Sequence, residues 1–134
     1  MTKAGRLIKA YAIWDDKVKN KRFDLDRMRE RKTSIKIIYS KTPGGEPESL
    51  EDYAVKIDEA ERELAYYKQK RFLAFSELMA AMQKLKTYKQ FDILYRRGIL
   101  RESWTKICLD LDMSRSGATA LYDRAIKALD DLGG

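Results

Sequence analysis

A single short segment of the chain is rich in helix-breaking residues, and the stretches on either side of it are long and uninterrupted. Both prolines and two of the seven glycines fall within residues 43–47, a composition typical of a turn or loop. Neither Pro nor Gly occurs in residues 6–39 or in residues 48–97. This distribution predicts an all-α fold in which a loop of residues 41–49 joins two long helices.

The first stretch carries apolar side chains at alternating intervals of four and three residues. A repeat of 3.5 residues is typical of a coiled-coil seam, and two lysines fill its missing steps. The pattern predicts one helix over roughly residues 4–40. Its apolar seam positions are Leu7, Tyr11, Trp14, Val18, Leu25, Met28, Ile35 and Tyr39, with Lys21 and Lys32 in the gaps.

The second stretch repeats the pattern and predicts a helix over roughly residues 50–86. Its seam comprises Leu50, Ala54, Ile57, Leu64, Phe75, Leu78, Met82 and Leu85, with Ala60, Tyr67 and Phe72 shifting the apolar face sideways in the middle. Two such helices fold back antiparallel across a short loop, so residues 1–86 are expected to form a helical hairpin.

Both helices carry more apolar side chains than one seam uses. The surplus consists of Ile8, Ile13, Ile37, Ile38, Phe72 and Leu73. Such a surplus favours self-association, and we expect a homodimer, unless the C-terminal part of the chain covers these residues.

Composition argues against several classes of function. The 134 residues contain no His and one Cys, which removes the imidazole base of many hydrolases and makes a zinc site implausible. No Gly-rich phosphate loop is present, so we expect no enzyme, no metal and no cofactor. No apolar run approaches the 18 residues of a membrane span, no signal peptide is apparent, and the lone Cys fits a reducing cytoplasm.

The net charge of +7 is unevenly distributed along the chain. Residues 17–36 hold nine Lys or Arg against three Asp or Glu, whereas residues 87–134 hold eight against seven. A basic stretch of this kind attracts phosphates through its field, although a solvated helix face has the same composition.

The last third of the chain shows the pattern of a helix-turn-helix domain in residues 87–134. A first helix near residues 88–97 is expected to stop at Gly98. Ser103 is a candidate N-cap for a helix over residues 104–111, and Ser114 for a longer helix over roughly residues 115–130. A short helix, a tight turn at Asp112 and a longer helix with a polar first turn are typical of DNA readers.

Three segments of this region resemble promoter-reading region 4 of bacterial sigma factors: Leu94 to Ile99, Ser103 to Leu111 and Met113 to Leu129. The chain is more similar still to short phage- and prophage-encoded proteins of Gram-positive bacteria, in which a helical pair precedes such a C-terminus. Arg6 to Tyr11 and the Gly-rich break near residue 44 fit that family too. The resemblance implies a phage-type transcriptional regulator in the bacterial host cytoplasm, with double-stranded DNA as partner and host RNA polymerase as a further candidate.

The sequence departs from the sigma pattern at three places. Cys108 replaces a small residue, and Asp112 replaces the turn Gly. Residues 116–120 lack the β-branched residues and the additional Arg that the family tends to place there. Gly117 also costs the helix about 1 kcal/mol. Specific binding is therefore expected to need a dimer or tethering to RNA polymerase.

The candidate DNA contacts form three groups. Arg115, Ser116 and Thr119 open the third helix, where Arg115 is expected to fork onto guanine and to contribute most to sequence discrimination, and the two hydroxyls are candidates for phosphate or base-edge contacts. Phosphate contact is expected further along that helix from Tyr122, Arg124 and Lys127, and at the start of the domain from Arg96, Arg97 and Arg101. Trp104 and Cys108 are interpreted as core residues.

Two other classes of function fit the same architecture. A small terminase subunit also joins a helix-turn-helix to oligomerising helices, but its DNA-binding domain usually comes first in the chain. An inhibitor of a host enzyme built on this scaffold is the second alternative. A ring-sized oligomer would indicate a packaging protein, a dimer would indicate a regulator, and failure to bind DNA would indicate the inhibitor.

Overall fold

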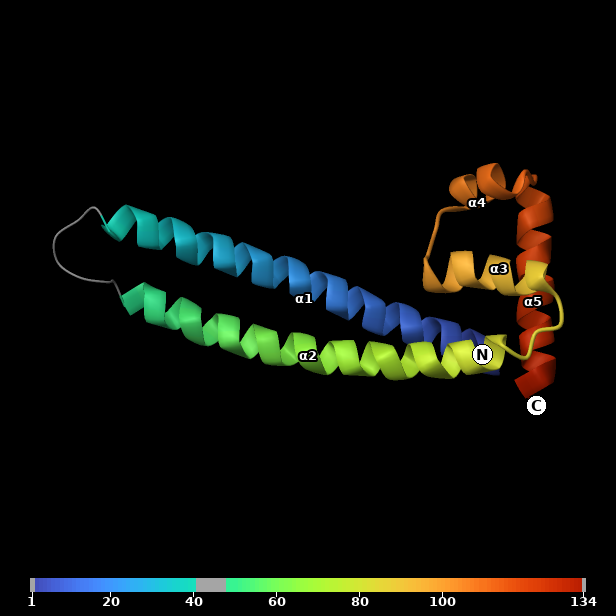
Figure 1. Cartoon of the computed structure of the whole chain (residues 1–134), viewed down its shortest axis with the longest axis horizontal. Helices are drawn as coiled ribbons and strands as arrows, with labels where there is room; N and C mark the ends of the chain where they lie inside the picture. Colours follow the sequence, from blue (N-terminus) through green and yellow to red (C-terminus); the bar gives the residue numbers. More distant parts are fainter. Residues whose placement is uncertain (1, 41–47, 134) are drawn as a thin grey trace. The chain divides into compact units, whose positions relative to one another are not determined.

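A computed structural model describes residues 2–40 and 48–133, and it confirms the predicted all-α fold (Figure 1). No strand occurs among these residues, which form five α-helices and one π-helical turn, η1. The elements are α1 (Lys3–Ser40), α2 (Glu48–Met82), α3 (Tyr88–Leu94), η1 (Tyr95–Ile99), α4 (Trp104–Leu111) and α5 (Arg115–Gly133). The predicted loop of residues 41–49 lies largely outside the described residues, and α2 already begins at Glu48.

The chain divides into two compact units, whose boundaries lie inside the two long helices. One unit contains residues 14–70, and the other contains residues 1–13 together with residues 71–134. The sequence pattern places a division between residues 86 and 87 instead. The ends of α1 and α2 therefore pack with the C-terminal helices.

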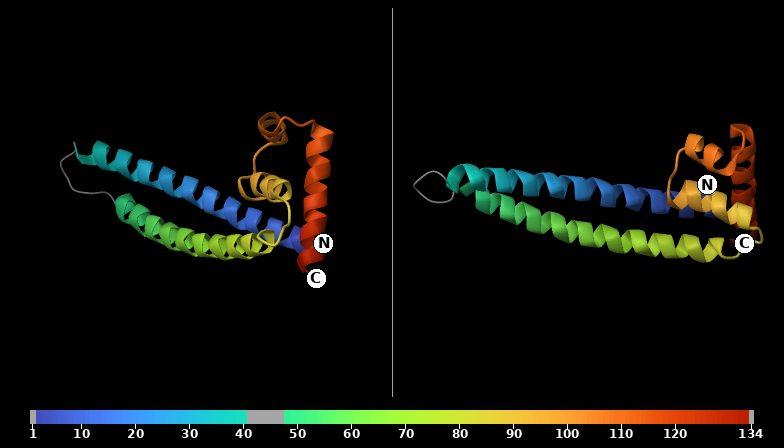
Figure 2. Two further views of the ribbon diagram at one scale, coloured as in Figure 1. Left: turned by 45° about the vertical axis from the view of Figure 1, so that its right-hand side comes forward. Right: turned by 45° about the horizontal axis from the view of Figure 1, so that its top comes forward.

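Within residues 14–70, α1 and α2 lie side by side and pack through the predicted seam (Figure 2). Val18 and Leu25 of α1 are buried with Ala60 and Leu64 of α2. Ion pairs flank this seam on α1: Lys21 Nζ lies 2.7 Å from Glu63 Oε2, and Arg29 Nη2 lies 2.9 Å from Glu61 Oε1. The lysine expected to fill a seam gap thus gains a carboxylate partner on the other helix, and its pKa is raised chiefly by the hydrogen bond to Glu63.

In the other unit, every helix contributes side chains to a single core. Ala4 and Tyr11 of α1 and Leu78 and Met82 of α2 are buried against side chains of the C-terminal helices. The buried residues on the C-terminal side are Ile93, Leu94, Ile99, Ile107, Ala118, Leu121, Ala125 and Leu129. The backbone N–H of Ala4 donates a 2.8 Å hydrogen bond to Asp130 Oδ1 of α5, which satisfies one free donor in the first turn of α1.

Two predicted helix ends are wrong. Helix α2 ends at Met82, not near residue 86, because Lys84 N and Leu85 N bond to carbonyls only three residues back and tighten the chain into a turn. Gly98 does not stop the helix that begins at Tyr88, which continues through the π turn η1. Gly98 is buried, and a Cβ there would lie 3.9 Å from the Ile8 side chain, an ordinary van der Waals distance, so neither helix termination nor packing requires a glycine at this position.

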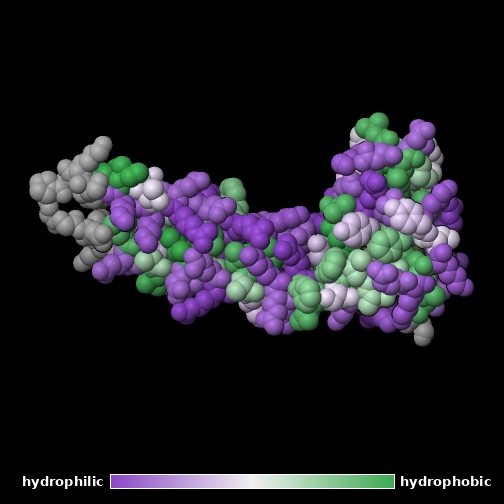
Figure 3. Space-filling model, viewed as in Figure 1, coloured by the Kyte–Doolittle hydropathy of each residue, from purple (hydrophilic) through white to green (hydrophobic). Residues whose placement is uncertain are grey.

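Most of the surplus apolar side chains are exposed. Of the six, only Ile8 packs on the core, whereas the other five are at least 43% exposed: Ile13, Ile37, Ile38, Phe72 and Leu73. Two seam assignments are also corrected, because Ala54 and Phe72 point to solvent while Ala60 and Tyr67 lie on the seam. Apolar patches accordingly interrupt the hydrophilic surface in Figure 3.

Candidate nucleic-acid interface

The helix-turn-helix is formed by α4 and α5, and side-chain caps define the start of both helices. Ser103 Oγ accepts a 3.2 Å hydrogen bond from Lys106 N, and Ser114 Oγ accepts a 3.1 Å bond from Gly117 N. Both predicted N-caps are thereby confirmed. Between the helices Asp112 adopts the left-handed conformation, with φ 52° and ψ 52°, as expected for an Asp in place of the turn Gly.

The first turn of α5 projects polar side chains into solvent. Arg115 and Ser116 are exposed, and the Ser116 hydroxyl lies 3.3 Å from that of Ser114. Thr119 is half-buried, and its hydroxyl donates back to the carbonyls of Arg115 and Ser116. Of the three predicted groove contacts, Arg115 and Ser116 thus present their polar ends to solvent, while the Thr119 hydroxyl proton is already bonded within the helix.

Trp104, the first residue of α4, gathers three of the predicted contact residues around its indole ring. The guanidinium carbon of Arg97 lies 4.8 Å from the ring centroid, and that of Arg115 lies 5.7 Å away. The Tyr122 ring meets the indole edge-on, with the centroids 5.5 Å apart and the planes at 83°. Arginines at such distances gain a cation–π attraction, so Trp104 fixes where these side chains lie.

The two arginines around Trp104 have no carboxylate partner among the described residues. Arg97 Nη1 donates to the Glu102 carbonyl oxygen at 2.8 Å, which orients the side chain without neutralising it. Burial raises the pKa of the Tyr122 hydroxyl above its ordinary value, while the charge of Arg97 acts in the opposite direction. The hydroxyl therefore stays protonated at neutral pH and can donate a hydrogen bond.

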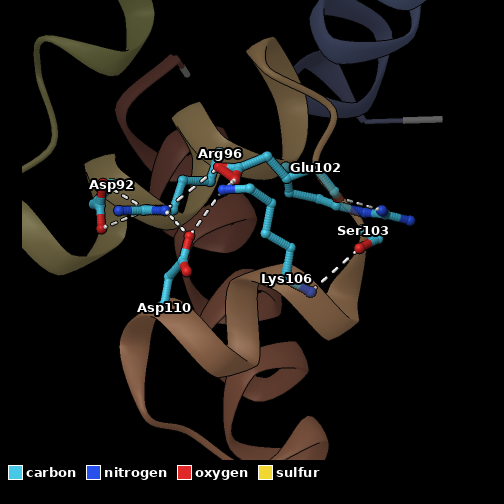
Figure 4. Close-up of polar contacts among 7 residues, drawn as sticks. Asp92, Arg96, Glu102, Ser103, Lys106 and Asp110 are labelled. Atoms are coloured by element: carbon cyan, nitrogen blue, oxygen red, sulfur yellow. Dashed lines mark hydrogen bonds and ion pairs between the residues drawn. The ribbon is translucent and has the colours of Figure 1, made fainter.

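Arg96, the neighbour of Arg97, has a different environment (Figure 4). Its guanidinium lies within 3.4 Å of carboxylate oxygens of Asp92, Glu102 and Asp110. Lys106 Nζ completes the network at 3.0 Å from both Glu102 Oε2 and Asp110 Oδ2, although Glu102 Oε2 is buried and accepts no well-aligned hydrogen bond. This network ties α3 and η1 to α4, so the structure gives Arg96 a local scaffolding contact.

The remaining predicted contacts lie apart from the Trp104 cluster. Arg124 and Lys127 are exposed on later turns of α5. Arg101 is exposed in the segment between η1 and α4, where its φ of 55° places it in the left-handed region. The structure therefore brings together Arg97, Arg115 and Tyr122 but leaves Arg101, Arg124 and Lys127 as separate positive side chains.

Comparison with family models, with curated proteins and with solved structures finds no match to this chain. The candidate site consequently rests on its own geometry.

No three His, Cys, Asp or Glu side chains in residues 2–40 and 48–133 gather as a metal site would require. No helix of that part of the chain combines the length and the apolar content needed to cross a membrane.

The sequence pattern predicts Trp104 as a core residue and does not reveal that Arg97 and Arg115 approach its ring. The ring is only half-buried, and it packs against the core through one part of its surface. The sequence carries only a weak signal of this cluster, because Trp104 follows an N-cap and lies seven residues after Arg97. Only the fold shows that Arg115 and Tyr122 also lie near the Trp104 ring.

Proposed function

We propose that this protein binds double-stranded DNA through the helix-turn-helix formed by α4 and α5. The observation that carries the proposal is the exposed first turn of α5, next to two guanidinium groups that have no carboxylate partner in the described structure. A recognition helix presents its N-terminal residues to the major groove, and unpaired arginines beside it suit backbone phosphates.

The discriminating variant is Ser116→Asp, which places a negative charge where the DNA would lie. An acidic residue in the first turn of a helix interacts favourably with the helix dipole, so the substitution should preserve folding. We expect at least a tenfold weaker affinity for duplex DNA in an anisotropy titration. Ser76→Asp makes the same change at an exposed position of α2 and is the matched control. Equal affinities for the two variants would contradict the proposal.

The resemblance to sigma region 4 extends the proposal from DNA in general to promoter DNA in a phage or prophage programme. Mapping the DNA bound by the full chain in host cells tests this extension. A regulator should be enriched upstream of a small set of genes, whereas a packaging protein should be enriched at a packaging site. Absence of enrichment anywhere would favour the enzyme-inhibitor alternative.

We further propose that the protein works as a homodimer associated through its helical hairpin. The support is the exposed apolar side chains within residues 14–70: Phe23, Ile37, Ile38, Val55 and Tyr66. Light scattering of the full chain should give twice the monomer mass. A monomer would contradict this association, and a ring-sized oligomer would favour the small-terminase alternative.

A further inference from the structure

Arg115 lies at the edge of the exposed surface of α5. The buried side of the helix is marked by Ala118, Leu121 and Ala125, and at 100° per residue Ser116 and Asp123 lie almost opposite to it. Arg115 is rotated towards the side of Tyr122, which follows it by two helical turns and packs on Trp104. The most outward positions of α5 therefore belong to other side chains, and Arg115 borders α4.

Two positive groups near one ring repel each other, and an anion bound by both would offset that repulsion. Arg97 and Arg115 approach the Trp104 ring within 4.8 and 5.7 Å, and no carboxylate of the described chain neutralises either. In the neighbouring network, by contrast, three carboxylates surround Arg96 and neutralise its charge. Guanidinium groups match phosphate oxygens in geometry, and the Tyr122 ring packs on the same indole.

We propose that Arg97 and Arg115, positioned by Trp104, bind the same backbone phosphate at the edge of the groove, with the Tyr122 hydroxyl as a further donor. Arg115 is then a phosphate contact and not a reader of base edges. The inference rests on the proposed DNA binding and specifies how one site achieves it. The outward-facing residues of α5, of which Ser116 is the first, then discriminate between DNA sequences.

The salt dependence of binding distinguishes one shared phosphate from two separate ones. Each phosphate that a protein neutralises contributes about 0.9 to the slope of log affinity against log salt concentration. If the two arginines share a phosphate, the Arg97→Ala, Arg115→Ala double variant should lose about 0.9 of slope. If each arginine binds its own phosphate, the double variant should lose about 1.8, and each single variant about half of that.

The measurement uses the full chain and a randomised duplex of about 20 base pairs, titrated at four salt concentrations. A matched control is the Lys56→Ala, Arg62→Ala variant, which removes two positive charges from exposed positions of α2 and should leave the slope unchanged. The double arginine variant should also bind about tenfold or more weakly at the lowest salt. Additive slope losses would overturn the shared site while leaving DNA binding intact. Absence of binding by the wild-type chain would overturn both.

Trp104 is a positioning residue in this proposal, and its effect should depend on the arginines. Trp104→Leu in the wild-type chain should weaken binding, and Trp104→Phe should recover part of the loss because it retains a ring. Added to the double arginine variant, Trp104→Leu should cause less than about a twofold further loss, the limit expected if it acts only through them. A full additional loss would show that Trp104 contributes independently and would contradict its positioning role.

Discussion

Asp112 occupies a backbone conformation that glycine adopts at lower cost. Its φ of 52° at the end of α4 is unfavourable for residues with a Cβ, and a carboxylate near a helix C-terminus also opposes the helix dipole. We predict that Asp112→Gly raises the free energy of unfolding by about 0.5–1 kcal/mol, measured by urea denaturation. Asp112→Asn removes only the charge and serves as the control. A destabilised glycine variant would contradict this account of the turn.

The ion pairs around Arg96 predict how the stability of the C-terminal helices depends on pH. The hydrogen bond from Lys106 lowers the pKa of Asp110 below its ordinary value, and that hydrogen bond together with the ion pair to Glu102 raises the pKa of Lys106. A carboxyl group whose pKa is lower in the folded state stabilises that state at pH values above its ordinary pKa. This stabilisation is lost as the pH falls through the lower pKa of the folded state. While its carboxylate partners are ionised, the raised Lys106 pKa contributes fully below pH 10.5, and the contribution is lost as the pH rises through the pKa of the folded state.

We therefore predict that Asp110→Asn destabilises the protein at pH 7 and that the difference from wild type begins to shrink as the pH falls through about 3.8, the ordinary Asp pKa, and is lost below the lowered pKa of the folded state. Denaturant unfolding at pH 3, 5 and 7 provides the measurement. Asp123→Asn, at an exposed position of α5, should show no such convergence. A pH-independent difference for Asp110→Asn would mean that the ion pair is not responsible.

At the scale of single elements, the first turn of α5 couples a glycine to the cap of the helix. A Cβ on Gly117 would lie 3.1 Å from Ser114 Oγ, the atom that accepts the capping bond from Gly117 N. We predict that Gly117→Ala gains little in the wild-type chain, because crowding of the cap offsets a helix-propensity gain of about 1 kcal/mol.

In a Ser114→Ala background the hydroxyl is absent, and the same Gly117→Ala substitution should give the full gain of about 1 kcal/mol. Unfolding free energies of the four proteins complete a double-mutant cycle. Equal gains in both backgrounds would show that the glycine is not retained for the sake of the cap.

The elements that could be predicted from sequence are those fixed by local chemistry. The two long helices follow from apolar periodicity, and the caps at Ser103 and Ser114 follow from hydroxyl residues before apolar runs. The different environments of Arg96 and Arg97 could not be predicted, because the residues are identical and adjacent. Only the packing of η1 against α4 places one beside carboxylates and the other beside Trp104.

At the scale of the whole molecule, the shared core predicts which parts of the chain can fold alone. Residues 87–134 by themselves lack Tyr11, Leu78 and Met82, which are buried in the core of that unit. Burial of each such side chain contributes about 1.5–3 kcal/mol, so their joint loss is comparable to the 5–15 kcal/mol of a typical domain. We predict that the isolated 87–134 fragment does not unfold cooperatively.

A chain that keeps residues 1–13 and 71–134, joined by a short Gly-Ser turn, retains those core residues and should unfold cooperatively. Thermal melts followed by circular dichroism compare the two designs. The joined chain also lacks the exposed apolar side chains of residues 14–70, so it should be monomeric. A cooperative transition for residues 87–134 alone would contradict the shared core.

The π turn η1 has a consequence for the evolution of this scaffold. Leu100 N bonds to Tyr95 O, five residues back, so the turn contains one residue more than an α-helical turn. Such a turn has the form that a single-codon insertion leaves in a regular helix. Deleting Tyr95 would shift Arg97 into the register of Arg96, beside the carboxylates, and would put Gly98 where Arg97 now meets Trp104. A lineage without that codon would lose one of the two arginines that approach Trp104.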